Sequence, residues 1–161
     1  MKSTQYLIPI IKKSFNVDIA LPGSKSIALR QLAMSALTEC TTTLEGLPIC
    51  DDTAAMLDCL QHMGLLITQN NTTIQITGPM NLVDNVEINP RMSGASTRLL
   101  IALAALRSGK TLIDGHESLR ARTNLPLLIT LKKLGCRIES RDGYLPPVSY
   151  THLTLPTNRE V

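Results

Sequence analysis

"SKSIALRQLAMSALTECTTTLEG", residues 24–46, has a near-copy in "SGASTRLLIALAALRSGKTLIDG", residues 93–115. The similarity continues beyond both stretches, because Arg30 and Arg98, Gly46 and Gly115, and Gly64 and Gly135 are each separated by roughly 70 residues. A repeat of this length is too long for a solenoid unit. The sequence therefore predicts two copies of one supersecondary module.

Each copy has the pattern strand, helix, strand, helix, hairpin, which is the βαβαββ order of an α/β fold. The first strands come from "NVDIALP" (16–22) and "NVEINP" (85–90). The first helices cover 26–38 and a span that begins at Ser93 or Ser96 and ends at 109. Asp51 or Asp52 caps the second helix of copy one, Thr123 or Asn124 that of copy two, and a glycine ends each. The hairpins are 65–77, with its turn at 70–71, and 136–147.

The helix around residues 99–106 is apolar on nearly every side, which is typical of a helix buried on all faces. We therefore expect the helices to lie inside and the sheets to face outward. The first unit is expected at 16–80 and the second at 81–147.

Composition excludes several functional classes. With one Phe, three Tyr and no Trp, the 43% of hydrophobic residues predict an aliphatic core and no stacking platform for nucleic acid. The net charge of +3 is too small for a DNA-binding surface. No apolar run suits a signal peptide or a membrane span. We expect a soluble cytoplasmic protein, with its four cysteines acting as small buried hydrophobes.

The segment 148–161 differs from the rest of the chain in showing neither helical nor strand periodicity. It resembles the translation of a sequencing-library adapter, and we interpret it as a sequencing or cloning scar that cuts the gene within the protein. The alternative is a genuine disordered C-terminus.

Cations stand at the predicted helix starts of both copies. Lys25 and Ser26 follow a Pro-Gly pair, with Arg30 one turn on, and Arg98 follows Gly94 in the second copy. A third group, Arg120 and Arg122, precedes another helix. Free N–H groups and the helix dipole favour an anion at a helix start. The pattern predicts a small ligand with several negative groups; the alternative is that these are solvated surface charges.

Other chemistries fit less well. The GxxxxGK[ST] spacing of a P-loop is absent, and neither a Ser-His-Asp arrangement nor a metal-binding motif is present. His116 lies near the arginines and is interpreted as a bystander. Asp51 and Asp52 are most simply a helix cap, although one of them could orient a cation of the site.

"LPGSKS" (21–26) with Arg30, "DD" (51–52), "SGASTR" (93–98) and "DGHESLRAR" (114–122) together resemble the 3-phosphoshikimate 1-carboxyvinyltransferase (EPSP synthase) family. The resemblance covers about residues 16–147. It implies an inside-out α/β barrel of two domains, each with three βαβαββ units, of which this chain holds two. Residues 1–15 would join the other domain.

The resemblance also implies roles by position. The reaction would add the 5-hydroxyl of shikimate 3-phosphate to phosphoenolpyruvate, protonate the methylene and release phosphate, without metal or organic cofactor. Lys25 would be catalytic and contact both substrates. The full-length enzyme is expected to be a monomer. The remaining expected positions are Ser26 and Arg30 for shikimate 3-phosphate; Gly94, Arg98 and Arg122 for phosphoenolpyruvate; and Asp52 and Arg120 as additional site residues.

The chain departs from the family pattern at four positions. Met92 and Ala95 replace a usual Asn and Thr beside phosphoenolpyruvate, while Ala121 and Thr123 replace Glu and Pro. The proton-transfer carboxylate would lie in the absent C-terminal part, so we expect no turnover by this chain alone.

Two alternatives stay open. The related UDP-N-acetylglucosamine enolpyruvyl transferases carry Asn where Ser26 stands and a reactive Cys in the loop equivalent to 116–122, where this chain has none. The other alternative is a non-catalytic anion-binding remnant.

Overall fold

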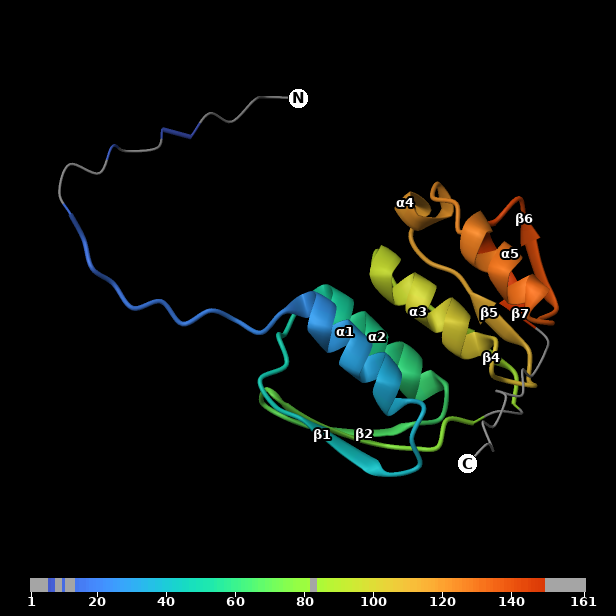
Figure 1. Cartoon of the computed structure of the whole chain (residues 1–161), viewed down its shortest axis with the longest axis horizontal. Coiled ribbons are helices and arrows are strands. Elements are labelled where there is room, and N and C mark those ends of the chain that lie inside the picture. The colour runs from blue at the N-terminus through green and yellow to red at the C-terminus, as the bar shows by residue number, and fades with distance from the viewer. Residues whose placement is uncertain (1–5, 8–9, 11–13, 82–83, 150–161) are drawn as a thin grey trace, which may run out of the picture.

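A computed structural model describes residues 6–7, 10, 14–81 and 84–149. Helices and strands are interspersed along these ranges (Figure 1). The helices are α1 (Lys25–Ser35), α2 (Asp51–His62), α3 (Gly94–Ala104), α4 (Glu117–Arg120) and α5 (Leu125–Lys133). The strands are β1 (Thr41–Leu44), β2 (Leu66–Asn70), β3 (Thr73–Thr77), β4 (Val86–Ile88), β5 (Thr111–Ile113), β6 (Ile138–Arg141) and β7 (Tyr144–Ser149).

The two sheets share one strand order. The first is β1-β3-β2 and the second is β4-β5-β7-β6, so removing β4 leaves equivalent three-stranded orders. In both, the last strand of the hairpin pairs antiparallel with the strand that follows the first helix. β4 adds to the second sheet by parallel pairing with β5. The repeat expected from the sequence is therefore a structural repeat.

The strand expected at 16–22 is absent, and this expectation was wrong. Residues 14–24 form no helix or strand and extend away from the body of the molecule (Figure 1). Val17, Ile19 and Leu21 are 58%, 73% and 83% exposed. Among the described residues β1 pairs with β3 alone, and none of them takes the position in the first sheet that is equivalent to β4. Alternating apolar residues favour a strand, but a strand forms only where a neighbour supplies hydrogen bonds.

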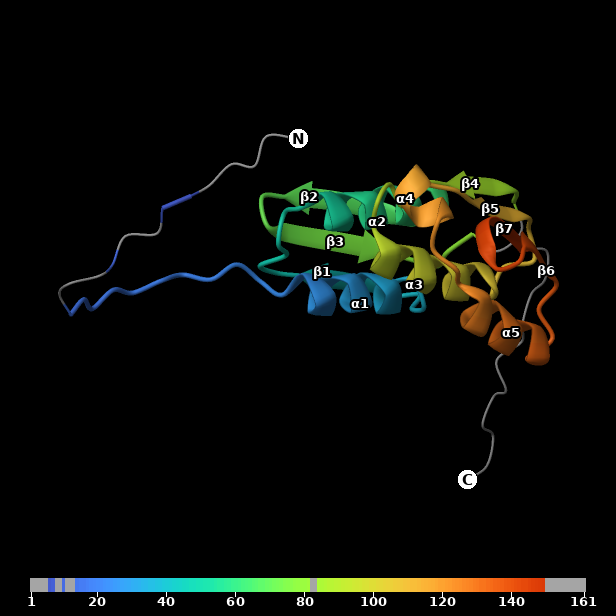
Figure 2. The same ribbon diagram turned by 90° about the horizontal axis from the view of Figure 1, so that it is seen from above.

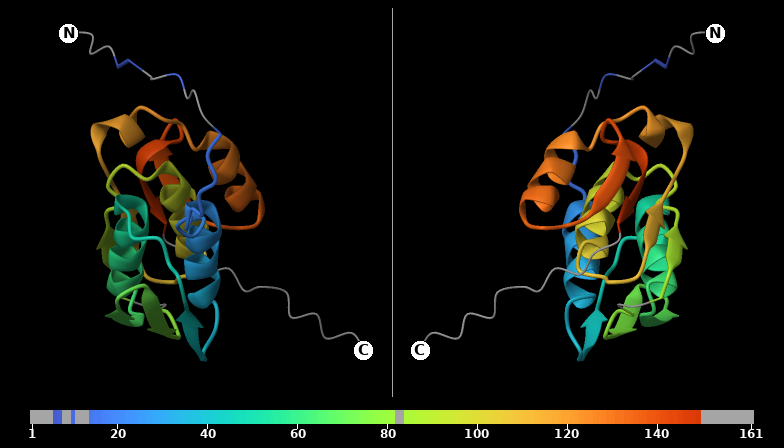
Figure 3. Two further views of the ribbon diagram at one scale, coloured as in Figure 1. Left: turned by 90° about the vertical axis from the view of Figure 1, so that its left-hand side faces the viewer. Right: turned by 90° about the vertical axis from the view of Figure 1, so that its right-hand side faces the viewer.

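Three of the helices, α1, α2 and α3, pack against one another between the sheets, as expected. α1, α2 and α3 are in mutual contact and lie side by side in the views of Figures 2 and 3. Their shared core is aliphatic, with Leu29, Leu32, Met56, Leu60 and Leu100 at most 1% exposed. No described helix has the length and apolar character needed to cross a bilayer.

Helix ends differ from the expectations in detail. Cys50, not Asp51 or Asp52, is the N-cap of α2, because its backbone N–H donates to the Thr53 hydroxyl (3.1 Å) in a capping box. α3 begins after Ser93 and ends at Ala104, five residues before Gly109, while α5 follows Asn124. Four-residue α4 was not foreseen. The final glycines of α2 and α5 have positive φ, as a C′ position favours.

Two further expectations meet the structure only in part. β7 continues to Ser149, which pairs with Thr111, so the first two residues of the segment interpreted as a scar belong to a strand. Residues 150–161 lie outside the described residues. Of the cysteines, Cys59 and Cys136 are buried, Cys50 is half-buried and Cys40 is exposed. Cys40 therefore corrects the expectation of four buried thiols, since it follows a turn at the surface.

Arg107 fixes the segment that leads into β4. Its side chain is fully buried. Its Nε donates to the Asn81 carbonyl (2.6 Å), and its Nη2 donates to the Asp84 carbonyl (2.7 Å). Its Nη1 donates to the Thr111 hydroxyl at 2.6 Å. One buried guanidinium therefore fastens the connection between the units to the end of α3 and to β5.

Replacing Arg107 with Met should lower the free energy of unfolding by about 2–4 kcal/mol, because buried partners lose their donor. Urea unfolding measures the change. Arg141→Met, at an exposed position of β6, is the control and should change stability by less than about 0.5 kcal/mol. Equal effects of both substitutions would contradict the role given to Arg107.

Candidate functional site

Helix starts converge at one end of the helix layer. The first turns of α1, α2 and α3 and the N-cap of α5 line one cavity of about 330 Å³. Unpaired N–H groups at helix starts, together with the helix dipoles, give such a place a positive potential. The lining residues are Lys25, Asp52, Met92, Ser93, Gly94, Ala95, Thr97, Arg98, Leu119, Arg122 and Asn124.

Lys25 and Asp52 form an ion pair on one wall. The Lys25 Nζ lies 2.5 Å from Asp52 Oδ2; the lysine side chain is 54% exposed and the aspartate 23%. The hydrogen bond to Asp52, with its charge, raises the pKa of Lys25 above its ordinary value. The ammonium therefore stays charged at neutral pH and faces solvent at the cavity.

The opposite wall is the start of α3. The buried Ser93 caps this helix, its Oγ accepting from the Ser96 N–H at 3.3 Å and lying 2.7 Å from the Ser96 hydroxyl. Gly94 follows, and a Cβ at this position would lie 3.3 Å from the Arg122 Nη1. The absence of a side chain lets the guanidinium approach the first turn closely.

Arg120 and Arg122 have different surroundings although they are two residues apart. Arg120 donates from Nε and Nη2 to the Asp114 carboxylate, at 2.9 and 2.5 Å. These hydrogen bonds lower the pKa of Asp114 below its ordinary value. Arg122 lines the cavity, and its guanidinium has no hydrogen bond or ion pair to any residue in the described ranges. In this loop, Arg120 is therefore paired with Asp114, whereas the guanidinium of Arg122 faces the cavity and can bind a ligand.

The structure brings together five of the residues expected at the site: Lys25, Asp52, Gly94, Arg98 and Arg122. Ser26, Arg30 and Arg120 do not line the cavity. Ser26 and Arg30 are exposed on α1, where the Arg30 Nη1 donates to the Ser26 carbonyl at 2.7 Å. They adjoin the cavity through Lys25, which precedes Ser26 in the chain.

Sequence reasoning assigned no ligand role to the Thr97 and Asn124 positions that also line the cavity. Asn124 was singled out only as a helix cap. Its N–H donates to the Gly143 carbonyl at 2.8 Å, which ties the start of α5 to the second hairpin. Its equivalence to the start of α2 in the repeat is the signal that could have placed it at the cavity.

A larger cavity, of about 430 Å³, lies between α2 and β4. Its wall includes Asp58, Glu87 and Asp114 with a single arginine, Arg91. This excess of carboxylates does not suit an anion. Among the described residues no group of three or more His, Cys, Asp or Glu side chains could hold a metal ion.

Comparison with known proteins gives a consistent result. The family model described as EPSP synthase (3-phosphoshikimate 1-carboxyvinyltransferase) matches residues 11–157. The 3-phosphoshikimate 1-carboxyvinyltransferase of Rhizobium etli is 38% identical over 130 residues, which are 80% of this chain and 31% of that protein. That of Trichormus variabilis is 29% identical over 149 residues, covering 89% of this chain and 35% of the relative.

Solved structures resemble the fold. The EPSP synthase of Acinetobacter baumannii superimposes with a TM-score of 0.70 at 24% identity, covering 82% of this chain and 31% of that one. The enolpyruvyl transferase NikO of Streptomyces tendae gives a TM-score of 0.55 at 19% identity, covering 77% and 29%. The chain spans about a third of the length of the curated relatives it matches. With a family model that matches nearly its whole length, two repeated α/β units and a cationic cavity at their helix starts, the chain belongs to the EPSP synthase family.

Proposed function

We propose that this chain carries the helix-start half of an active site for enolpyruvyl transfer from phosphoenolpyruvate to the 5-hydroxyl of shikimate 3-phosphate, with release of phosphate. The observation that carries the proposal is the cavity at which the starts of α1 and α3 meet Lys25, Arg98 and Arg122. Neither helix has an acidic residue in its first turn. Family membership names the anions that such a cavity would take.

Phosphoenolpyruvate is assigned to the cavity itself. Gly94 leaves its backbone open to the ligand, while Arg122 offers a guanidinium with no other described partner. Arg98 lies one turn further along α3. A guanidinium can bind a phosphate or carboxylate through two parallel hydrogen bonds. Shikimate 3-phosphate is assigned to the exposed side of α1, where Ser26 and Arg30 lie.

Lys25 borders both assigned regions and is proposed as the catalytic residue. In the ligand-free arrangement its charge is balanced by Asp52. A bound anion would share the ammonium with this carboxylate, so Asp52 would hold Lys25 in place between substrates. The hydroxyl oxygen adds to the enolpyruvyl carbon as the hydroxyl loses its proton and the methylene gains one. The C–O bond to phosphate then breaks while the new methyl group loses a proton, which restores the double bond. Fixed cations lower the energy of such steps by stabilising the charge that develops on the reacting phosphate and carboxylate groups.

We propose that this chain carries only part of the complete active site, because the relative is about three times longer than the matched segment. We therefore propose that the chain binds these anions but does not turn them over, and that the complete enzyme does both. A monomeric complete enzyme and a cytoplasmic location belong to the same proposal. Eight curated relatives of this chain are all named 3-phosphoshikimate 1-carboxyvinyltransferase, which favours this reaction over that of the UDP-N-acetylglucosamine enzyme.

Calorimetric titration of the 161-residue chain with each substrate tests the proposal. We expect binding of both, and Lys25→Met should weaken it by about tenfold, the effect of one charge-assisted hydrogen bond. Circular dichroism shows that each sample is folded. A folded wild-type chain that binds neither ligand would instead support a non-catalytic remnant, and product formation by the purified chain would contradict the lack of turnover.

The two loop arginines provide a matched pair. Arg122→Gln should weaken phosphoenolpyruvate binding by about tenfold, whereas Arg120→Gln should leave it nearly unchanged because Arg120 is committed to Asp114. NMR titration should show the pKa of Asp114 rising toward its ordinary value in Arg120→Gln only. The lowered pKa stabilises the fold above the unfolded pKa of Asp114, and this contribution is lost as the pH falls through the folded pKa.

If Arg120→Gln weakened phosphoenolpyruvate binding as much as Arg122→Gln, the separation of the two roles would be wrong.

Gly94→Ala should weaken phosphoenolpyruvate binding without lowering the stability of the fold. The added methyl would lie 3.3 Å from the Arg122 Nη1, so the guanidinium must move outward, and phosphoenolpyruvate should bind several-fold more weakly. Alanine is a better helix residue than glycine by up to about 1 kcal/mol, so stability should not fall. Calorimetry and urea unfolding measure the two effects. In an Arg122→Gln background the glycine substitution should have no further effect on binding, and an undiminished effect there would show that the methyl acts by another route.

A further inference from the structure

Arg91 has an unusual backbone for an arginine. It occupies the first central position of the turn from Pro90 to Ser93, which is closed by a hydrogen bond from the Ser93 N–H to the Pro90 carbonyl (2.9 Å). Its φ is +54°, while Met92 has no positive φ. This combination has the features of a type II′ turn, in which glycine is the usual residue at the first central position. A long side chain here strains the backbone, and such strain tends to persist at functional sites.

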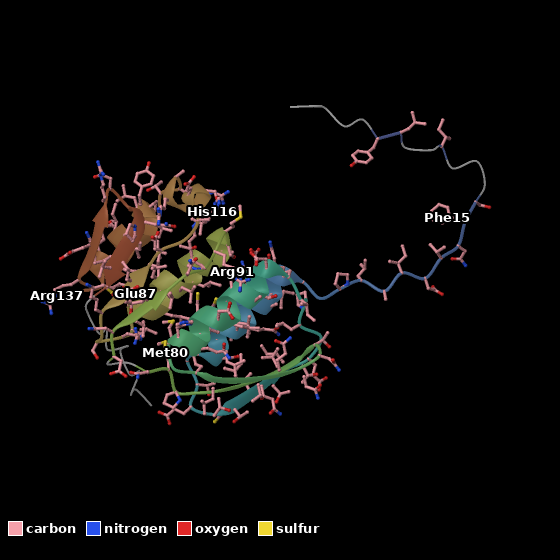
Figure 4. The ribbon with its side chains drawn as sticks, turned by 180° about the vertical axis from the view of Figure 1, so that it is seen from behind. Phe15, Met80, Glu87, Arg91, His116 and Arg137 are labelled. Atoms are coloured by element: carbon pink, nitrogen blue, oxygen red, sulfur yellow. The ribbon has the colours of Figure 1, made fainter. Side chains whose placement is uncertain are left out.

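The side chain of Arg91 bridges two carboxylates of α2. Its Nη1 lies 2.5 Å from Asp51 Oδ1 and its Nη2 lies 2.5 Å from Asp58 Oδ2. Asp51 and Asp58 stand about two turns apart on the same face of the helix. The turn before α3 is therefore attached to the side of α2 at two points (Figure 4).

The backbone of Arg91 makes two further contacts. Its N–H donates to the Asn89 side-chain oxygen at 2.8 Å, and its carbonyl accepts from the His116 N–H at 2.9 Å. Gly115 is packed so closely that a Cβ there would lie 2.9 Å from this carbonyl. The same residue thus also holds the loop that leads to Arg122.

These contacts join the three walls of the anion cavity. α2 carries Asp52 and, through it, Lys25; the turn carries Ser93 and the start of α3; and the loop carries Arg122. Arg91 reaches all three without lining the cavity itself. Its side chain holds α2 and its backbone holds the loop, so this one residue links all three walls from outside the cavity.

Stability alone does not account for this arrangement. The side chains of Arg91, Asp51 and Asp58 are 41%, 64% and 51% exposed, and ion pairs with that much exposure contribute little to stability. The strained backbone works against stability as well. What the two ion pairs provide is a fixed position of the turn relative to α2.

We propose that Arg91 is a positioning residue, which sets the spacing of the Lys25, Gly94 and Arg122 walls of the anion cavity through Asp51, Asp58 and the backbone of His116. The inference rests on the proposed function for the identity of the ligand. Its contacts, however, are independent of that identity.

The test compares the 161-residue chain with Arg91→Gly, Arg91→Lys, Asp58→Asn and the Arg91→Gly/Asp58→Asn double variant. We expect Arg91→Gly to weaken phosphoenolpyruvate binding at least fivefold without lowering the urea midpoint of unfolding, because glycine relieves the backbone strain. Arg91→Lys, which can still reach one carboxylate, should recover part of the affinity. The double variant should bind no more weakly than Arg91→Gly, since both changes break the same connection.

Asp142→Gly is the matched control. Asp142 also has a φ of +54°, but it lies in the turn between β6 and β7. The substitution likewise puts glycine at a position of positive φ, and it should leave affinity unchanged. An unchanged affinity of Arg91→Gly, or a loss of affinity that merely follows a loss of stability, would overturn the proposal.

Amide hydrogen exchange separates this inference from the proposed function. In Arg91→Gly the amides of Ser93 and His116 should exchange at least tenfold faster, while that of Ile76 in β3 should not change. If the wild-type chain binds no phosphoenolpyruvate but this exchange pattern is found, the proposed function fails and the positioning of the turn stands. Unchanged exchange at Ser93 and His116 overturns the positioning role whether or not the ligand binds.

Discussion

The mutual packing of α1, α2 and α3 is the constraint on which the rest of the structure depends. Their apolar faces are buried against one another, and the ends of the helices are brought into register by this contact. Lys25 therefore meets Asp52 across two helix starts, and the Ser96 hydroxyl lies 3.5 Å from the Asp52 carbonyl across a third. Aligned helix starts concentrate unpaired N–H groups and positive potential in one place. The positive potential on which the proposed anion site depends is a consequence of how the core packs.

The periodicity of the sequence predicts most of the fold, because helices and hairpins are determined by local patterns of apolar residues. The glycine after each second helix was predicted in this way, whereas the hairpin turn lies at Asn71 and Thr72, one residue later than the expected 70–71. The missing strand at 16–22 shows the limit of such patterns. Its alternating residues are as suitable for a strand as those of β4, but β4 has β5 beside it, whereas no described strand lies beside residues 16–22. Strand formation depends on a partner that no local pattern can supply.

The site was predictable to a similar degree. The repeat and the family motifs together predicted Lys25, Gly94 and Arg122, and the structure places all three at one cavity. The same reasoning could not separate Arg122 from Arg120, because both are arginines in one short loop. The difference comes from Asp114, whose carboxylate faces Arg120 only once the loop has turned back on β5. Whether a charged side chain already has an ion-pair partner depends on the tertiary structure, and sequence spacing does not reveal it.

Met92 and Arg91 are neighbours in the turn that precedes α3. Met92 lines the cavity and is 55% exposed, so this turn offers the ligand an apolar side chain where the family resemblance implies an amide. The backbone at the start of α3 and the surrounding cations are then the groups left to bind the anion. Such groups act only if they are held at the right distance, because an unfilled gap of an ångström forfeits most of a hydrogen bond. A turn that has lost a direct ligand contact therefore gains importance as a spacer. The bridge from Arg91 to α2 is consistent with that change of role.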